Sequence, residues 1–432
     1  MFSKKAKSKK NTNIDYADVL LPRLIFILST LALLLFGLVM IYSASNAEAI
    51  DNGESYYSYL IKQGGFCLVG ILIAVFIWKK IPYDFWRSNL IWFFLGFSIL
   101  LLILTLAFGT DTNGARRWVG TGGLKFQPSE FVKVILILAT AKIYFDYVDG
   151  HQNFKKSLIL GVLINLTCLG FILVAQSDLG TCIIITVGII SVLYFAGVSK
   201  RIIFGLILLI IGLGLLCIIV APYRLTRLAI FLDPYNDGNG GLGDGYQYVR
   251  SRYALADGGL FGVGLGNSYE KYQYLPEAET DYIFAVICEE LGLLGGMFVC
   301  ILFLVFIISG LFTIRTSRNS FAISSSSSLI MMIGVQAFIN IFCVVGLFPT
   351  TGKPLPFISY GGSSVIATLV MVGIVLSSSH IATNKQKTYE RKASSFTLIT
   401  DDKQKRKQRR ERYKRTSISS NNNRRSRTRN KQ

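Results

Sequence analysis

The stretch from Lys271 to Gly296 carries the residues best suited to chemistry, because an acidic loop there runs directly into a long apolar segment. Asp281 lies at the border between the two, and Glu289 and Glu290 follow about two helical turns deeper in the apolar segment. Carboxylates inside a membrane are costly and usually functional. We therefore expect Asp281 to act as a general base at the membrane surface, with Glu289 and Glu290 structural or linked to an ion. The alternative is that Thr280 and Asp281 cap a helix N-terminus.

The composition places the chain among polytopic membrane proteins. Hydrophobic residues make up 52% of the 432 positions, the mean hydropathy is +0.48, and apolar runs of about 20 residues recur, long enough to cross a bilayer as helices. The predicted fold is all-α, with about ten membrane-spanning helices. They are expected at residues 20–42, 59–78, 88–109, 128–145, 157–176, 179–197, 202–221, 282–314, 326–348 and 357–380.

The net charge of +20 is concentrated at the two ends of the chain. Lysines crowd the first residues, and the last residues combine lysine and arginine with serine and asparagine, a composition that cannot bury a core. We therefore expect a basic cytoplasmic N-terminus at 1–19, a membrane domain at 20–382, and a basic disordered cytoplasmic tail at 383–432. The ends suit anionic membrane lipids. Nucleic acid is not an expected partner, because no folded module accompanies the tail.

Basic residues in the short connections orient the predicted helices. They fall in alternate connections, on the side of both termini, and the positive-inside rule makes that side cytoplasmic. The opposite side carries the connection 109–127, the turn at Asp178, a long loop at 222–281 between the seventh and eighth predicted helices, and the connection 349–356. Every unusual polar motif therefore faces outside, which predicts one site on the external face of the membrane.

Two arginines and a lysine on the external side suit an anionic ligand. Arg116 and Arg117 precede Trp118, and Lys125 follows shortly after. A guanidinium grips phosphate oxygens with two hydrogen bonds and a lysine adds a point charge, so a pyrophosphate group is a natural ligand. The alternative is an interfacial anchor, with Trp118 at the headgroup level and the arginines on ordinary lipid.

Other polar residues have mainly structural interpretations. Glu130 and Lys133 stand at a predicted helix start, where their i, i+3 spacing lets the two charges neutralise each other. Asp178 is expected to cap the next helix, with a contact to a metal ion as the alternative. The glycine run 258–266 favours close backbone packing, since no strand precedes it as a dinucleotide fingerprint requires. Lys353 adds another external cation.

Four segments of the chain resemble the SEDS proteins of bacterial shape, elongation, division and sporulation, which include FtsW and RodA. These segments are GARRW with QPSE, QSDLGT, GLGNS through YLPEAETDYIFAVICEELG, and PLPFISYGGSS. The resemblance implies a glycosyltransferase that polymerises lipid II into glycan strands beside a class B penicillin-binding protein that crosslinks them. It places the family's acid on Asp281 and its arginine on Arg117, with Lys125 at the matching later position. Lys353, directly before the last segment, and Ser359 within it join the expected pyrophosphate-binding residues.

The residues and the resemblance lead to one mechanistic hypothesis. Asp281 accepts the proton of the acceptor sugar hydroxyl, which attacks the anomeric carbon of the donor chain with inversion. Undecaprenyl pyrophosphate then leaves, and its charge needs stabilisation rather than protonation. Arg117 and Lys125 are expected to supply that stabilisation, with a divalent cation, Mg²⁺ or Mn²⁺, as a further candidate.

Three other functions compete with this hypothesis. The basic tail and the Pro-Glu-Ala before Glu279 favour a division member of the family, with other division proteins as partners, over an elongation or sporulation member. A lipid II flippase is the alternative from a different class, and it predicts ionisable residues near mid-bilayer in broken helices. A scaffold that only recruits the transpeptidase predicts that Asp281→Asn retains all function. We favour the polymerase because the polar residues gather on one side.

Overall fold

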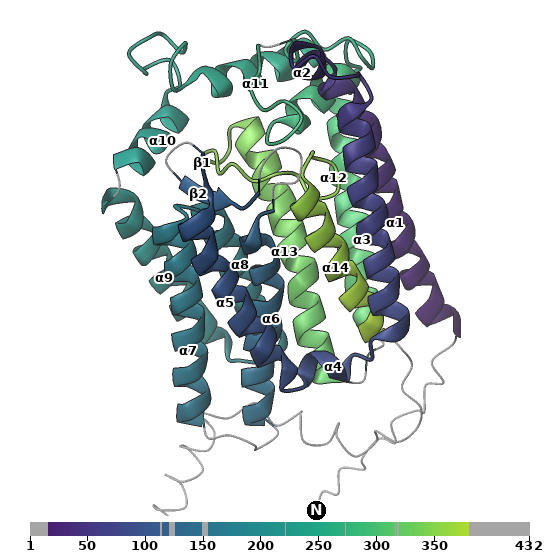
Figure 1. Cartoon of the computed structure of the whole chain (residues 1–432), viewed down its shortest axis with the longest axis vertical. Coiled ribbons are helices and arrows are strands. Elements are labelled where there is room, and N and C mark those ends of the chain that lie inside the picture. The colour runs from purple at the N-terminus through teal and green to yellow at the C-terminus, as the bar shows by residue number, and fades with distance from the viewer. Residues whose placement is uncertain are drawn as a thin grey trace, which may run out of the picture.

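The apolar segments of the sequence form long helices that run side by side in a bundle, shown by the computed structural model in Figure 1. The structure describes residues 16–379, except 113–114, 121–125, 149–153, 221, 273, 316 and 318. Lys125, residues 1–15 and the predicted tail at 383–432 therefore lie outside the described residues. We call the end of the bundle that carries α10 and α11 in Figure 1 the upper end.

A helix coincides with each predicted segment. The bounds are α1 (Tyr16–Ala44), α3 (Ser58–Lys80), α5 (Leu90–Phe108), α6 (Pro128–Val148), α7 (Phe154–Gly170) with its π-helical continuation η1 (Phe171–Ala175), α8 (Leu179–Phe195), α9 (Lys200–Val220), α12 (Ile283–Arg315), α13 (Ser320–Val345) and α14 (Gly362–Ser378). Within the described residues, five of these helices, α1, α3, α5, α12 and α13, are long and apolar enough to cross a membrane. The protein is thus a predominantly helical, polytopic membrane protein.

Shorter elements join these helices, and several of them were not predicted. They are α2 (Asn46–Asp51), α4 (Asp84–Arg87), β1 (Thr110–Thr112), β2 (Ala115–Trp118), α10 (Pro222–Leu232) and α11 (Tyr246–Gly258). β1 and β2 pair antiparallel, so the all-α prediction misses a small hairpin in the connection 109–127. The stretch 222–281 is also more ordered than a loop, because it contains both α10 and α11.

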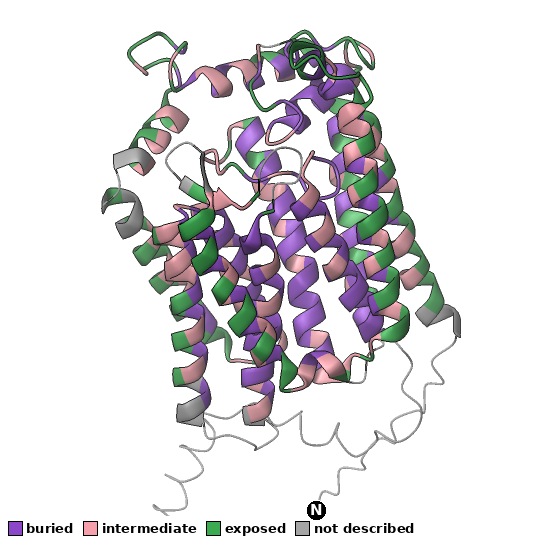
Figure 2. Ribbon diagram, in the orientation of Figure 1, coloured by how far each residue is buried: buried purple, intermediate pink, exposed green. Residues whose placement is uncertain are grey.

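α13 forms the centre of the bundle and contacts α6, α8, α12 and α14. Most of α13 is buried (purple in Figure 2). The outer faces of α1, α3 and α9 are largely exposed (green), as expected of surfaces that meet lipid. A run of buried serines, 324–328, lets neighbouring helices approach closely. Hydrogen bonds hold several of their hydroxyls; for example, Ser324 donates to the Val192 carbonyl of α8 at 2.9 Å and Ser328 donates to the Ser324 carbonyl at 2.8 Å.

α12 is broken at Gly292, whose backbone has φ 69° and ψ −170°. A break of this kind frees backbone groups that a membrane cannot solvate. The glycine-rich loop 258–266 satisfies them. The N–H groups of Val263 and Gly264 donate to the carbonyls of Glu289 and Glu290 at 2.9 and 3.0 Å, and the N–H of Leu293 donates to the Gly259 carbonyl at 2.9 Å. The predicted close backbone packing of this loop is confirmed.

The break changes the position expected for Glu289 and Glu290. Ser43, the residue before the last of α1, donates its hydroxyl to Glu290 at 2.7 Å. The acidic pair therefore lies level with the upper end of α1. The prediction was that the two carboxylates lie about two helical turns deeper in the apolar segment. The structure instead places Glu290 beside the end of α1, and the helix is interrupted at Gly292, two residues later.

Gly292→Ala should destabilise the protein strongly. A β-carbon there would lie 2.4 Å from both the Gly262 nitrogen and the Leu260 oxygen, and φ is positive. We expect a loss of about 1–3 kcal/mol or more in the free energy of unfolding, since backbone strain alone costs that much. Gly64→Ala in α3 is the matched control, because no atom lies within 4 Å of its added β-carbon. Equal unfolding temperatures for the two variants would contradict the packing described.

Candidate active site

Three segments from distant parts of the sequence meet at the upper end of the bundle. They are the turn at 176–178 before α8, the segment 277–281 before α12, and the loop 349–361 between α13 and α14. Backbone contacts hold the last two together. The N–H of Tyr360 donates to the Glu279 carbonyl at 2.9 Å, and the Ser359 hydroxyl donates to the Thr280 carbonyl at 2.5 Å. Ser359 thus holds the backbone of Thr280, the residue before Asp281, in place.

Asp281 lies half-buried two residues before the start of α12. Burial, together with the negative charge of Glu277, raises the pKa of its carboxyl to about 6, while Lys353 and Arg227 oppose the rise. Such a carboxyl changes its protonation state close to neutral pH, as a general base requires. The capping alternative is not supported by the described contacts, since the Thr280 hydroxyl donates to the Glu277 carboxylate at 2.6 Å rather than accepting from the first turn of the helix.

Asp178 caps α8, as the sequence predicts. Its carboxylate accepts hydrogen bonds from the Thr181 N–H at 3.0 Å and the Thr181 hydroxyl at 2.8 Å. It also receives the Lys353 ammonium at 2.7 Å, and both side chains are buried. Burial by itself would raise the pKa of Asp178, but the charges of Lys353 and Arg117 outweigh it and hold the pKa below its usual value. Asp178 therefore anchors Lys353 at the site.

Arg117 and Arg116 point to different places. The Arg117 guanidinium donates to the carbonyl of Gln176 at 2.7 Å and to that of Ser177 at 2.9 Å. It thereby supports Ser177, a non-glycine residue with a positive φ of 51°. Exposed Arg116 donates instead to the Leu106 carbonyl at 3.0 Å. The structure brings Arg117 to the site with Asp178 and Lys353, but not Arg116.

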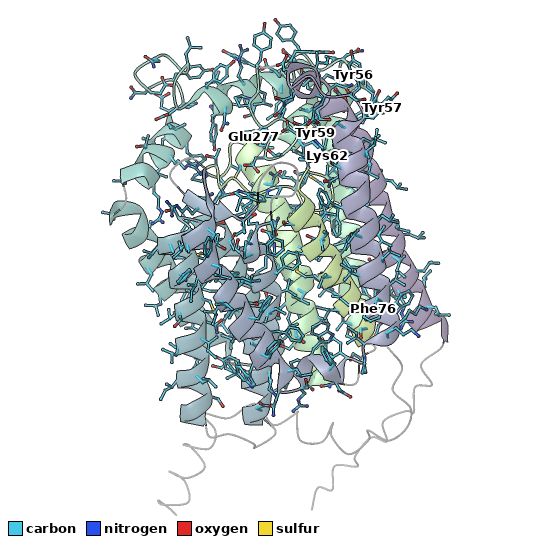
Figure 3. All side chains as sticks on the ribbon, viewed as in Figure 1. Tyr56, Tyr57, Tyr59, Lys62, Phe76 and Glu277 are labelled. Carbon is cyan, nitrogen blue, oxygen red and sulfur yellow. The ribbon has the colours of Figure 1, made fainter. Side chains whose placement is uncertain are left out.

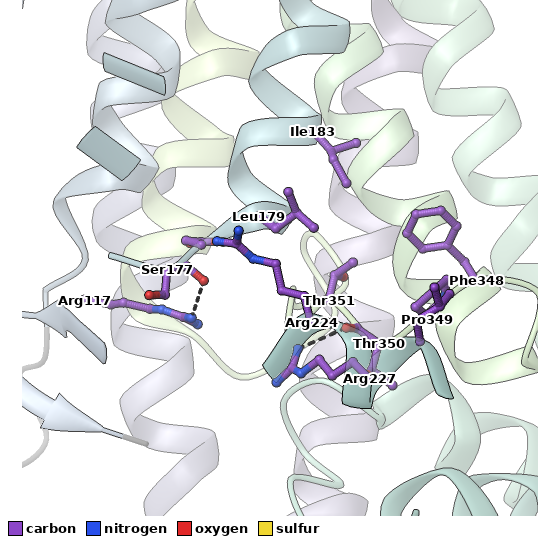
Figure 4. Close-up of a pocket in the computed structure, with 13 residues that line it drawn as sticks. Arg117, Ser177, Leu179, Ile183, Arg224, Arg227, Phe348, Pro349, Thr350 and Thr351 are labelled. Atoms are coloured by element: carbon purple, nitrogen blue, oxygen red, sulfur yellow. Dashed lines mark hydrogen bonds between the residues drawn. The ribbon is translucent and has the colours of Figure 1, made fainter. Parts of the chain in front are cut away.

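A pocket opens beside these groups (Figure 4). Its wall combines apolar and cationic side chains from the hairpin, α8, α10 and the loop after α13. The lining residues are Arg117, Ser177, Asp178, Leu179, Gly180, Ile183, Arg224, Arg227, Leu228, Phe348, Pro349, Thr350 and Thr351. An apolar wall with guanidinium groups suits an amphipathic anion such as a lipid phosphate.

Comparison with known proteins identifies the chain. The model of a family of cell cycle proteins, FtsW/RodA/SpoVE, matches residues 23–384. The chain belongs to this family. A probable peptidoglycan glycosyltransferase FtsW of Nitrosomonas europaea is 38% identical over 85% of this chain and 95% of its own length. The stage V sporulation protein E of Bacillus subtilis is 36% identical over 82% of this chain and 96% of its own length.

Solved structures of family members share the fold. The rod shape determining protein RodA of Thermus thermophilus superposes with a TM-score of 0.59 at 26% identity, covering 82% of this chain and 94% of RodA. A chain from a peptidoglycan synthase complex, described as coordinating polymerization and crosslinking, gives a TM-score of 0.63 at 28% identity and covers 81% of this chain and 95% of its own length. This protein therefore shares its helical bundle with these solved structures.

Four acidic and basic residues named from the sequence have structural contacts away from the pocket. The Lys133 ammonium meets Glu130 at 2.7 Å, which confirms that the two charges neutralise each other. Glu290 pairs with Lys271 at 2.8 Å. Glu289 accepts the Ser268 hydroxyl at 2.5 Å and the Tyr269 and Glu270 N–H groups at 2.6 and 3.2 Å.

The described donor groups do not fit a resident divalent cation. Among the described residues, no three His, Cys, Asp or Glu side chains gather as metal ligands. The Asp178 carboxylate, the expected contact for a cation, is already engaged by Lys353 and Thr181. We therefore expect arginine and lysine side chains of this protein to supply the positive charge at the site.

Sequence reasoning missed Arg224 and Arg227 of α10. Arg227 donates to the carbonyl of Thr350 in the pocket wall at 3.0 Å, and Arg224 donates to the carbonyl of Leu173 in η1 at 3.2 Å. Their i, i+3 spacing beside Leu225 and Leu228 is typical of an amphipathic helix lying at a membrane surface, and this was the available signal.

Proposed function

We propose that this protein is a peptidoglycan glycosyltransferase that polymerises lipid II during cell division. The observation that carries the proposal is the half-buried Asp281, whose pKa is raised to about 6 and which feels the charges of Arg227 and Asp178, two residues that line the neighbouring pocket. A base poised near neutral pH and a cationic cradle are the two parts that a transfer with a pyrophosphate leaving group needs.

In the proposed reaction, Asp281 takes the proton of the 4-hydroxyl of the acceptor lipid II. The hydroxyl oxygen then bonds to the anomeric carbon of the donor, and the bond from that carbon to the phosphate oxygen breaks with inversion. Undecaprenyl pyrophosphate leaves with the bonding electron pair. Arg117, Arg227 and Lys353 hold the developing negative charge, and Lys125 is proposed to join them from outside the described residues.

The proposed topology has about ten membrane crossings, with the upper end of the bundle outside the bacterial plasma membrane. Basic residues at the opposite end support this orientation, since Lys79 and Lys80 end α3 and Arg315 ends α12. Both termini are then cytoplasmic, and α10 and α11 belong to one long external connection between the seventh and eighth crossings. In Figure 3, Glu277 lies at the same end as Tyr59 and Lys62, and Phe76 lies toward the other end.

The proposed partners follow from the chemistry. Glycan strands need crosslinking, and the similar solved complex is described as coordinating polymerization and crosslinking. We therefore propose a class B penicillin-binding protein as partner, together with other division proteins. Membrane lipids surround the exposed faces of α1, α3 and α9, and no nucleic acid is proposed as a ligand.

The test supplies lipid II to the purified protein in liposomes, on the face that carries α10 and α11, and separates the products on a gel. Glycan chains of several lengths are the expected result. A parallel assay follows lipid II movement across the same liposomes. Movement of lipid II without any glycan product would overturn the polymerase and favour the flippase.

Arg224→Gln combined with Arg227→Gln should weaken substrate binding more than it slows the chemical step. Each charge-assisted hydrogen bond contributes about 1.5–3 kcal/mol, so we expect KM for lipid II to rise about tenfold or more. Lys62→Gln serves as the control, because Lys62 forms a surface ion pair with Glu54 and lines no part of the pocket. An unchanged KM in the double variant would remove both arginines from the proposed binding site.

A further inference from the structure

Asn340 of α13 joins the two segments that carry the proposed base and the anchored lysine. Its side chain is buried, with 2% of its surface exposed. The amide nitrogen donates to the backbone carbonyl of Asp281 at 2.7 Å and to the backbone carbonyl of Lys353 at 2.8 Å. One NH₂ group therefore spans two segments that lie far apart in the sequence.

The chemistry of the contact fixes the orientation of this side chain. Backbone carbonyls only accept hydrogen bonds, so the NH₂ group of Asn340, and not its oxygen, must face them. The amide oxygen is buried and has no hydrogen-bond partner among the described residues. Leaving a buried acceptor unsatisfied is unfavourable. Asn340 therefore stabilises the site through the two hydrogen bonds that its NH₂ group donates.

A second amide one turn earlier on α13 extends the same support. The Gln336 Nε2 donates to the Pro354 carbonyl at 3.0 Å, and its Oε1 accepts from the buried Lys133 ammonium at 2.9 Å. Gln336 therefore links the loop after α13 to Lys133 of α6, whereas Asn340 links that loop to the Asp281 segment. Ser359 and Tyr360 hold the two residues before Asp281 but do not reach Asp281 itself.

We infer that Asn340 is a positioning residue, which sets the distance between the Asp281 carboxylate and the Lys353 ammonium so that base and leaving-group charge act on one lipid-linked sugar. This inference rests on the proposed polymerase function. Asn340 touches no reacting atom; it acts through the backbone of the two residues that do. Misplacement of a reacting group by about 1 Å costs on the order of 100-fold in rate, so such a tether has a measurable effect.

Loss of the two Asn340 hydrogen bonds should change the pKa of Asp281 in a definite direction. The charged groups that face Asp281 are Glu277 before α12, Lys353 after α13, Arg227 on α10 and Asp178 before α8. The positive charge of Lys353 lowers the pKa of Asp281. If the two segments separate, this opposing effect weakens and the pKa of Asp281 rises. The acid limb of the pH–rate profile then moves to higher pH.

The experiment compares Asn340→Ala and Asn340→Ser with Asn165→Ala in the full-length protein. Asn165 is the matched control, since it is also a buried amide with two hydrogen bonds, to Thr140 and to the Gly161 carbonyl, but lies on α7 away from the site. We expect kcat to fall roughly 10- to 100-fold in Asn340→Ala with KM within about twofold, and the acid limb to shift upward. Asn340→Ser keeps one donor and should fall between Asn340→Ala and the wild type.

Amide hydrogen exchange supplies a readout that does not need activity. Peptides covering 277–285 and 349–357 should exchange faster in Asn340→Ala than in the wild type. Their exchange rates should be unchanged in Asn165→Ala. A pH profile and exchange rates equal to those of the wild type would overturn the inference, and so would equal kcat losses in Asn340→Ala and Asn165→Ala. Should the wild type make no glycan while exchange still responds, the proposed function fails and the tether stands.

Discussion

An Asp281→Asn variant is expected to lose nearly all lipid II polymerisation while remaining folded. General base catalysis typically contributes about 10²- to 10⁴-fold in rate, and an amide cannot accept the proton. The fold should survive, because the structural contact of this residue is made by its backbone carbonyl, which accepts from Asn340 at 2.7 Å. The measurement is glycan synthesis in liposomes, with thermal unfolding as the folding control. Near-normal synthesis by Asp281→Asn would refute Asp281 as the base.

The pH dependence gives a second view of the same residue. The base acts when deprotonated, and burial raises the pKa of Asp281 to about 6, so the wild-type rate should fall as the pH drops through about 6. The charge of Glu277 adds to this rise. Glu277→Gln should therefore lower the pKa of Asp281 and move the acid limb to lower pH, without removing activity. A limb that stays in place in Glu277→Gln would mean that another group controls it.

Lys271→Met is expected to be among the most destabilising single substitutions in the described chain. The Lys271 ammonium and the Glu290 carboxylate meet at 2.8 Å with 1% and 0% of their side chains exposed. Removing one partner leaves a buried charge uncompensated, which costs about 3–5 kcal/mol. The free energy of unfolding in micelles measures the effect.

A matched surface pair separates burial from ion pairing itself. Lys62 and Glu54 also meet at 2.8 Å, but with 36% and 38% of their side chains exposed. Lys62→Met should cost only about 0–1 kcal/mol. The double replacement Lys271→Met with Glu290→Met should recover much of the loss, because apolar residues of similar volume often replace a buried pair without cost. Equal losses in Lys271→Met and Lys62→Met would contradict the described burial.

Hydropathy predicted the positions of the bundle helices well, because a membrane imposes length and apolarity on each of them. It could not reveal the break at Gly292, because the apolar segment continues beyond this residue and the backbone hydrogen bonds that stabilise the break come from the separate loop 258–266. It also missed α10, whose apolar residues cover one face only. Length-based reading detects continuous apolar runs and overlooks short amphipathic helices.

The site was predicted in its residues more than in its contacts. The sequence indicated Asp178 and Lys353 separately, but their ion pair joins residues 175 positions apart and depends on how α8 and α13 pack. Arg117 was predicted to bind an anion, yet its described hydrogen bonds go to the carbonyls of Gln176 and Ser177. Local sequence gives the chemical type of a side chain, whereas its partner is a property of the tertiary fold.

The loop 258–266, which hydrogen-bonds to α12 where that helix is interrupted, differs along its length in how well it should tolerate substitution. Its contacts to α12 use backbone atoms, so they constrain shape and leave side-chain identity open. Phe261 projects outward with 79% of its surface exposed, whereas a β-carbon on the neighbouring Gly262 would lie 2.2 Å from the Glu290 carbonyl oxygen. Tolerance to substitution should therefore differ sharply between neighbouring residues of this loop, wide at Phe261 and almost nil at Gly262.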